Sequence, residues 1–247
     1  MKSGVKNYIP IDGAFDKSNI EHIKAIFADP DKEKLLSFIA SNNILTEELL
    51  LSLEVKNRIR AVREYEEMLD KDLLEKKWQD WFKLNDWVLG SEFVSILDER
   101  AVDTKNISDF LMRAYDGFLD IIEIKRPSIS LPFWAAHKDH DNYVPSVELT
   151  KAITQSTKYI YEVEREANSI KFLEKVDNVK TIKPRCILIF GRSNDWNPEQ
   201  KEAYRILNAS YHNLSILTYD HVLLRAKRIL DIDKPASEAL ESDKPPF

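Results

Sequence analysis

The sequence predicts an α/β protein of the mixed α+β kind, with a small mixed sheet flanked by helices and a helical N-terminal region before it. Three observations predict this class. Apolar residues recur at helical spacing as far as Leu84, strand-like stretches with a tight turn follow Gly90, and helical segments then alternate with two short apolar strands. Because each helix must bury its apolar stripe, this order favours a sheet covered on both faces.

The N-terminal region is predicted to consist of short helices. Segments 18–30, 31–43 and 45–62 each carry Ser, Asp or Thr where a helix N-cap belongs. No cluster of catalytic side chains occurs there. From its position alone, we expect residues 1–65 to act in regulation or in contacts between copies of the chain.

A charged helical segment leads into the second region. From Ser52 to Leu84, apolar residues keep helical spacing among dense charges, which predicts either one long helix or two helices joined end to end. The aromatic stripe Trp78, Trp81 and Phe82 is expected to belong to a core rather than to a binding platform.

The remaining elements follow the change of pattern at Gly90. The turn Tyr115–Gly117 joins two strands into a hairpin, and a loop over Pro127–Pro145 precedes a long helix. The predicted strands are 92–102, 109–114, 118–125, 185–192 and 214–219, and the predicted helices are 145–167, 198–213 and 220–230. We therefore expect a domain over residues 66–232, followed by a polar tail at 233–247.

Composition excludes several classes of protein. The five glycines include no two that are closer than nine positions, so the chain has neither a dinucleotide-binding fingerprint nor a phosphate-binding P-loop. No apolar run approaches the roughly 20 residues of a membrane helix, and the N-terminus lacks an apolar signal core. The single Cys186 cannot form an intrachain disulfide. We expect a cytoplasmic protein without a membrane segment or a nucleotide cofactor.

Charge alone does not predict a nucleic-acid partner. The net charge of the chain is −6. Residues 151–230 carry 14 basic and nine acidic side chains, a net +5, which suits either a phosphate-facing surface or an ordinary solvated helix face.

The hairpin carries the candidate chemistry. Strand side chains alternate, so Glu123 and Lys125 lie on one face while Ile122 and Ile124 lie on the other. With a three-residue loop in which Gly117 adopts the left-handed conformation, Asp109 lies directly opposite Glu123. A two-residue loop would instead place the Asp109 carboxylate on the core side, at a cost of several kcal/mol if it is unpaired.

Two opposed carboxylates repel each other and therefore favour a bound cation between them. Oxygen ligands suit a hard divalent ion, Mg²⁺ or Mn²⁺, which also binds substrate phosphate. Lys125 beside them could orient or deprotonate the attacking water, or neutralise the phosphate. Asp109, Glu123 and Lys125 together predict metal-assisted hydrolysis of phosphodiester bonds.

This combination resembles the PD-(D/E)XK nuclease superfamily. Asp109 and Glu123-Ile124-Lys125 match its hairpin motif, with Ser108 where the superfamily often has Pro. Gln155 and Tyr159, one turn apart on one helix face, match an additional QxxxY motif. Over about residues 70–230 the chain is similar to the Shedu anti-phage defence nucleases, and the resemblance does not extend to the first 65 residues.

The resemblance implies a restriction-endonuclease-like core that binds Mg²⁺ or Mn²⁺ and cuts or nicks DNA as a homo-oligomer in phage defence. It implies that Glu75 is a third acidic metal ligand beside Asp109 and Glu123, and that Gln155 positions Lys125 or a phosphate. The residues expected at the substrate are Lys125, Arg126, Lys151 and Tyr159.

Two other interpretations stay open. The chain could be a catalytically inactive DNA-binding or scaffold module of the same fold. Alternatively, His137, Asp139, His140 and Asp141, which lie close together in one loop, could bind metal in an unrelated phosphohydrolase that acts through His140 and Asp141.

Overall fold

The computed structural model describes residues 47–97 and 109–231. The chain divides into two compact units, Met1–Lys56 and Asn57–Phe247. Of the first unit only residues 47–56 are described, and they are helical. The helices predicted at 18–30 and 31–43 and the predicted tail lie outside the described residues.

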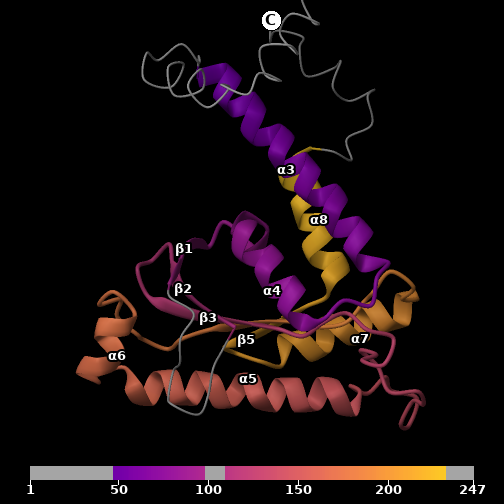
Figure 1. The fold of residues 1–247 in the computed structure, drawn as a ribbon. Coiled ribbons are helices and arrows are strands. Elements are labelled where there is room, and N and C mark those ends of the chain that lie inside the picture. Colours follow the sequence, from indigo (N-terminus) through magenta and orange to yellow (C-terminus); the bar gives the residue numbers. More distant parts are fainter. Residues whose placement is uncertain (1–46, 98–108, 232–247) are drawn as a thin grey trace, which may run out of the picture. The chain divides into compact units, whose positions relative to one another are not determined.

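A five-stranded sheet forms the centre of this unit (Figure 1), with the strands in the order β1-β2-β3-β4-β5. β1, β2 and β3 are antiparallel, whereas β3, β4 and β5 are parallel. The bounds are Phe93–Leu97 for β1, Phe110–Ala114 for β2, Leu119–Ile124 for β3, Cys186–Ile189 for β4 and Leu214–Leu217 for β5. The predicted mixed sheet is thus confirmed.

The β2–β3 hairpin has the predicted three-residue loop. Gly117 has φ +85°, the left-handed conformation, and Ala114 N–H donates to the Phe118 carbonyl oxygen at 2.9 Å. Phe110 pairs with Ile122. This confirms the register that brings the residue before β2 opposite Glu123, and the two-residue alternative is wrong.

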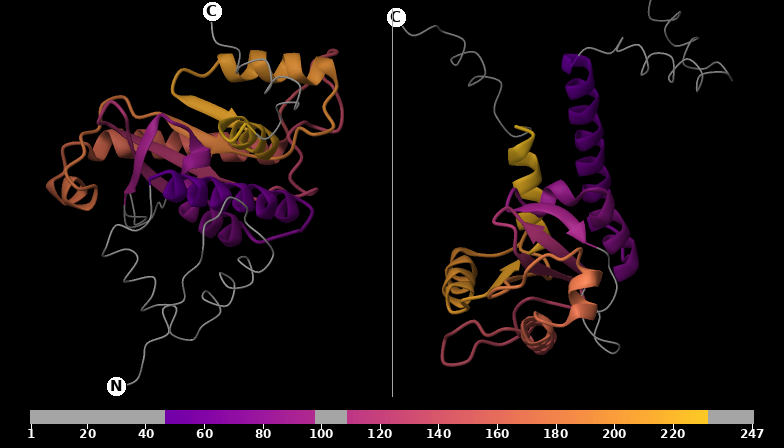
Figure 2. Two further views of the ribbon diagram at one scale, coloured as in Figure 1. Left: turned by 90° about the horizontal axis from the view of Figure 1, so that it is seen from above. Right: turned by 90° about the vertical axis from the view of Figure 1, so that its left-hand side faces the viewer.

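Helices cover both faces of the sheet, and each face has its own apolar core. On one face lie α5 (Val147–Glu166), α6 (Ile170–Lys175) and α7 (Pro198–Ala209). On the other lie α3 (Glu47–Leu69) from Asn57 onward, α4 (Glu75–Leu84), the 3₁₀ helix η1 (Asp86–Leu89) and α8 (Tyr219–Ile229). The right-hand view of Figure 2 looks along α5, which lies beneath the strands. Among the helices described, none is both long enough and apolar enough to cross a membrane.

The segment 52–84 forms two helices rather than one. α3 ends at Leu69 and α4 begins at Glu75, and α4 packs back against α3 through its aromatic side chains. The Tyr65 ring lies 5.3 Å from the Trp78 ring and 4.8 Å from the Trp81 ring, between centroids. The predicted core role of the stripe is confirmed, because Trp78, Trp81 and Phe82 are all buried.

Other element bounds differ modestly from the prediction. The helix predicted to reach residue 213 ends at Ala209, because Ser210 turns back and donates its hydroxyl to the Leu207 carbonyl oxygen. The short elements α6 and η1 were not predicted. Of the strand predicted over 92–102, the structure describes β1, and residues 98–102 lie outside the described part.

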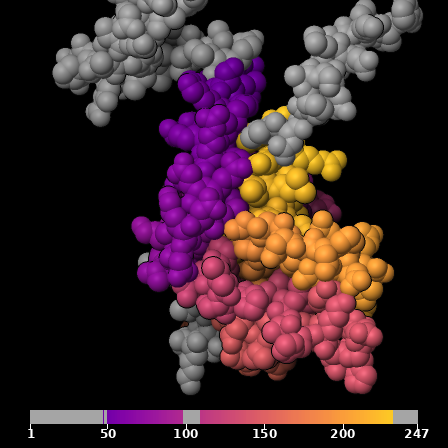
Figure 3. Space-filling view, turned by 90° about the vertical axis from the view of Figure 1, so that its right-hand side faces the viewer, coloured from indigo at the N-terminus to yellow at the C-terminus, as the bar shows by residue number. Residues whose placement is uncertain are grey.

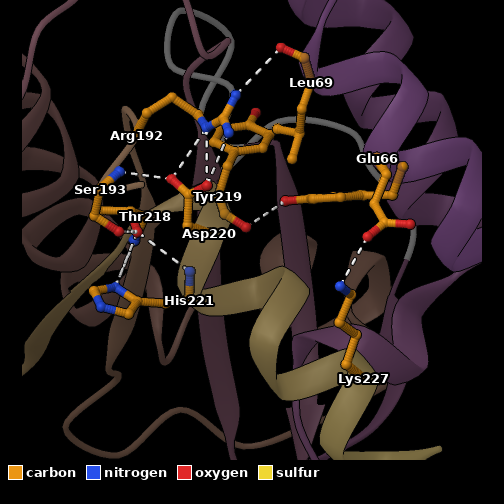
Figure 4. A network of polar contacts seen from close by, with 10 residues as sticks. Glu66, Leu69, Arg192, Ser193, Thr218, Tyr219, Asp220, His221 and Lys227 are labelled. Carbon is orange, nitrogen blue, oxygen red and sulfur yellow. Dashed lines mark hydrogen bonds and ion pairs between the residues drawn. The ribbon is translucent and has the colours of Figure 1, made fainter. Parts of the chain in front are cut away.

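A polar network connects the C-terminal end of α3 with α8 and with the loop after β4 (Figure 4). Arg192 forms a bidentate pair with Asp220, in which Nε donates to Oδ2 at 3.0 Å and Nη2 to Oδ1 at 2.9 Å, and its Nη1 donates to the Leu69 carbonyl oxygen. Tyr65 donates its hydroxyl to the carbonyl oxygen of Tyr219 at 3.1 Å. The network holds the start of the α3–α4 connection, and therefore the N-terminus of α4, at the ends of the parallel strands.

Candidate active site

The end of β3 carries two of the candidate residues. Glu123 shares a sheet face with Ile121, which lies in the core between the sheet and α5, and the Glu123 side chain is only 2% exposed. Lys125 follows directly after the strand, and its N–H donates to the Ile189 carbonyl oxygen of β4 at 2.9 Å. The Glu123 carboxylate is therefore buried by α5 rather than displayed on an open strand.

Asp109 lies immediately before β2, and both of its carboxylate oxygens accept hydrogen bonds. Ile124 N–H donates to Oδ2 at 2.6 Å, across the hairpin. The Gln79 side-chain amide, from α4, donates to Oδ1 at 2.6 Å. These two donors place the Asp109 carboxylate beside the end of β3, as the hairpin register predicts.

Lys125 lies between two acidic side chains. Its Nζ is 2.6 Å from Glu123 Oε1 and 3.8 Å from Oε1 of Glu75, the first residue of α4. The other Glu123 oxygen, Oε2, is buried and has no hydrogen-bond partner among the described residues. The structure thus brings the predicted Glu75, Asp109, Glu123 and Lys125 together and leaves one buried carboxylate oxygen without a partner.

Burial and mutual repulsion disfavour the ionised forms of both acids. Burial, followed by the Glu123 carboxylate, raises the pKa of Asp109 to about 8. Burial also raises the pKa of Glu123, although the Lys125 ammonium opposes that rise. Burial acts to lower the pKa of Lys125, but the charge and hydrogen bond of Glu123, together with the charges of Glu75 and Asp109, outweigh burial and raise the pKa. Lys125 is therefore protonated and positively charged in this metal-free cluster at neutral pH.

The QxxxY motif lies on α5, close to the same cluster. Gln155 Nε2 donates to the Tyr159 hydroxyl at 2.5 Å, and Tyr159 is buried. The pKa of Tyr159 is raised by burial and by the charge of Glu123, which places its hydroxyl within electrostatic reach of the acids. Gln155 thus bonds to Tyr159, and no hydrogen bond from Gln155 to Lys125 is found in the described residues.

The structure places the other two expected substrate contacts farther from the acids. Arg126 pairs with Asp72 in the α3–α4 connection, with Nη1 3.3 Å from Oδ1. Lys151 pairs with Glu148 on the exposed side of α5, at 2.7 Å. Lys151 also lines a groove along α5 that includes Gln155, the residue that bonds to Tyr159.

Gln79 is a residue of the site that the sequence did not reveal. It lies one helical turn after Glu75, on the same face of α4. Its position one helical turn after Glu75, a candidate metal ligand, was the only feature of the sequence that could have pointed to it. A glutamine on a charged helix has many surface roles, however, and nothing in the sequence connects it with Asp109.

The histidine-containing loop does not form a metal cluster. Its tip is exposed, and His140 bonds to the neighbouring Asp139 through Nδ1 at 2.9 Å. The loop lies beside α7 (Figure 3), where Lys138 pairs with Glu199 at 2.7 Å. Within the described part of the chain, the His and Asp side chains of this loop are not grouped closely enough to hold an ion as they stand.

The carboxylate cluster fits a hard divalent cation in its chemistry but is not arranged around one. Across residues 47–97 and 109–231, no three His, Cys, Asp or Glu side chains are grouped closely enough to hold a metal ion as they stand. Instead, the Lys125 ammonium occupies the space between Glu75 and Glu123. Three carboxylates against one ammonium nevertheless leave two negative charges when all are ionised. That charge, together with the unpartnered oxygen of Glu123, suits a doubly charged ion with oxygen ligands.

The raised pKa of Asp109 predicts an unusual dependence of stability on pH. An ordinary Asp has a pKa of about 3.9. In metal-free protein between pH 4 and pH 8, the folded chain therefore holds a proton that the unfolded chain has lost, so stability falls as pH rises through this window. Asn at this position can still accept the Ile124 N–H and cannot ionise.

We expect Asp109→Asn to stabilise the metal-free protein at pH 8 and to have little effect at pH 5. The gain in the free energy of unfolding relative to wild type should grow by about 4 kcal/mol across this range, since each of the three pH units contributes about 1.4 kcal/mol. Urea unfolding in EDTA at several pH values measures it. Equal pH dependence in both proteins would show that Asp109 is not forced to hold a proton.

The fold and the site define a mixed α/β protein with a buried cluster of acids and one lysine at the end of its central hairpin. Residues 72–223, more than half of the chain, match the family described as Shedu protein SduA, C-terminal. The chain therefore belongs to the Shedu family, which implies a role in anti-phage defence. No curated protein matches the chain.

Proposed function

We propose that the protein is a metal-dependent DNA endonuclease of the PD-(D/E)XK type that acts in anti-phage defence. One observation carries the proposal. The Asp109 and Glu123 carboxylates and the Lys125 ammonium converge at the end of one hairpin although burial disfavours their charges. A cluster that is costly to keep charged is typical of a functional site rather than of a structural ion pair.

Asp109, Glu123 and Glu75 are the residues that would hold Mg²⁺ or Mn²⁺. Such an ion, when bound, would activate a water molecule and stabilise the charge that develops on the phosphate. Glu123 offers its unpartnered Oε2. Glu75 lies at the half-exposed mouth of the cluster, where it reaches Lys125 at 3.8 Å.

Lys125 acts as a fixed positive charge rather than as a base in this proposal. A lysine side chain has a pKa of about 10.4 in water, and the carboxylates around Lys125 raise its pKa further in the metal-free protein, so at neutral pH the side chain is a proton donor rather than a base. The ammonium instead neutralises a phosphate oxygen of the substrate and orients the attacking water. Of the roles considered from sequence, the electrostatic ones are therefore favoured.

DNA would reach the cluster over the surface that carries Arg126 and the α5 groove. Lys151 lines that groove together with Gln155, whose amide donates to the Tyr159 hydroxyl, and the charges of the acids act on Tyr159. Arg126 and Lys151 are available for phosphate because their present ion pairs are on the surface, where such pairs contribute little energy. We also propose that the protein works as a homo-oligomer, as its family resemblance implies.

The proposal is tested by incubating supercoiled and linear DNA with wild-type protein in Mg²⁺ or Mn²⁺. We expect nicked or shortened DNA in either metal and intact DNA in excess EDTA. His140→Ala should cleave as wild type does, which separates this site from the histidine loop. DNA that is retained on the protein but never broken in any divalent metal would instead favour the inactive binding module.

A further inference from the structure

One side-chain contact in the acidic cluster comes from α4 and is made by an uncharged residue. The Gln79 amide Nε2 lies 2.6 Å from Asp109 Oδ1. We propose that Gln79 is a positioning residue, which holds the Asp109 carboxylate in the orientation that a divalent cation requires. This inference rests on the proposed function and concerns the same site.

With the Gln79 contact, each of the two carboxylate oxygens of Asp109 accepts a hydrogen bond. The Ile124 N–H fixes Oδ2 from the backbone of β3, so one oxygen is held by the sheet itself. Gln79 fixes the other oxygen and thereby sets the rotation of the carboxylate about its Cβ–Cγ bond. A carboxylate oxygen has lone pairs for more than one partner, so both oxygens can accept these bonds and still bind an ion.

An amide suits this position better than a charged side chain. A lysine or arginine here would neutralise Asp109 and compete with a cation for it, whereas a carboxylate would add to the repulsion from Glu123. The glutamine amide orients Asp109 without changing the net charge of the cluster. Hydrogen bonds of this kind to metal-binding carboxylates are a general way to fix ligand geometry.

The helix that carries Gln79 is itself rigidly held. The neighbouring Trp78 is fully buried, and its ring lies 4.6 Å from that of Tyr219 between centroids. Glu75, one turn earlier on the same helix, faces Lys125. One face of α4 therefore carries both Glu75, a candidate metal ligand, and Gln79, which orients a second candidate ligand, Asp109.

Manganese binding in the absence of DNA tests the inference without relying on cleavage. We would titrate Mn²⁺ into full-length protein and follow the free ion by electron paramagnetic resonance. Gln79→Met keeps the length and volume of the side chain but removes the donor, and Gln79→Ala removes both. Lys77→Ala, an exposed change on the same helix, is the matched control.

We expect both Gln79 variants to bind Mn²⁺ about 10–100-fold more weakly than wild type, and Lys77→Ala to bind within twofold of it. Cleavage by Gln79→Met should recover largely at saturating Mn²⁺, because the ligands themselves remain. Thermal unfolding of Gln79→Met in EDTA should match that of wild type. If Gln79 had a purely structural role, weaker metal binding would instead be accompanied by a lower unfolding temperature.

The outcomes separate this inference from the proposed function. If wild type binds Mn²⁺ and cleaves DNA, but Gln79→Met binds the ion with unchanged affinity, Gln79 does not position Asp109 and the nuclease proposal stands. If wild type neither binds Mn²⁺ nor cleaves DNA, both proposals fail. If Gln79→Met unfolds, the Gln79→Ala titration decides between a lost fold and a lost orientation.

Discussion

Lys125→Met is expected to lower the rate of DNA cleavage by about 10²–10³-fold at saturating Mg²⁺. The substitution keeps most of the side-chain volume and removes the ammonium that lies 2.6 Å from Glu123. The proposal assigns this charge to the reacting phosphate, so binding of DNA away from the cluster should change much less than cleavage. Single-turnover cleavage together with a DNA-binding measurement separates the two effects.

Lys125→Met is also expected to change the thermal stability of the metal-free protein. Without its ammonium, the buried Glu123 carboxylate loses the partner that opposes the rise in its pKa, so Lys125→Met should unfold at a lower temperature in EDTA. Added Mn²⁺ should restore more of that stability than it adds to wild type. Lys171→Ala, an exposed change on α6, should show neither effect. Cleavage by Lys125→Met at the wild-type rate would remove Lys125 from the reaction.

Glu123→Gln is expected to abolish cleavage and to remove most of the affinity for Mg²⁺ or Mn²⁺. A neutral amide cannot supply the charge that the proposed site offers to a divalent ion, and it replaces the buried oxygen that has no hydrogen-bond partner in the described residues. The loss in cleavage rate should be at least as large as that for Lys125→Met.

Stability should distinguish a lost site from a lost fold in this variant. Glu123→Gln removes a buried acid whose ionisation is disfavoured, but it also removes the closest charged partner of the Lys125 ammonium. Because these two effects oppose each other, the metal-free variant should remain folded at pH 8, with a stability close to that of wild type. Glu174→Gln, an exposed change on α6, is the control. Unchanged metal affinity in Glu123→Gln would contradict the assignment.

Local rules were sufficient to predict the hairpin and its acids. The strand alternation of residues 118–125 fixes which side chains share a face, and Gly117 permits the loop that sets the pairing. Asp109 and Glu123 could therefore be placed together before any tertiary contact was known. The buried stripe of α4 was predicted for the same reason, because its spacing depends on the helix alone.

Contacts between elements that are distant in the chain could not be predicted in this way. Gln79 reaches Asp109 over 30 positions, and Asp72 reaches Arg126 over 54. Both depend on the angle at which α4 leaves α3, and that angle is set by the packing of Tyr65 on Trp78 and Trp81. Helical spacing continues across residues 70–74, so the sequence left one helix and two helices as equal alternatives.

The most direct measurement of the central claim is the position of Mn²⁺ in crystals of the wild-type protein, located by its anomalous scattering. We expect one peak in contact with the carboxylates of both Asp109 and Glu123, with the Lys125 ammonium displaced from its present place between Glu123 and Glu75. A protein that cleaves DNA but binds its ion elsewhere, for example at the histidine loop, would contradict the account.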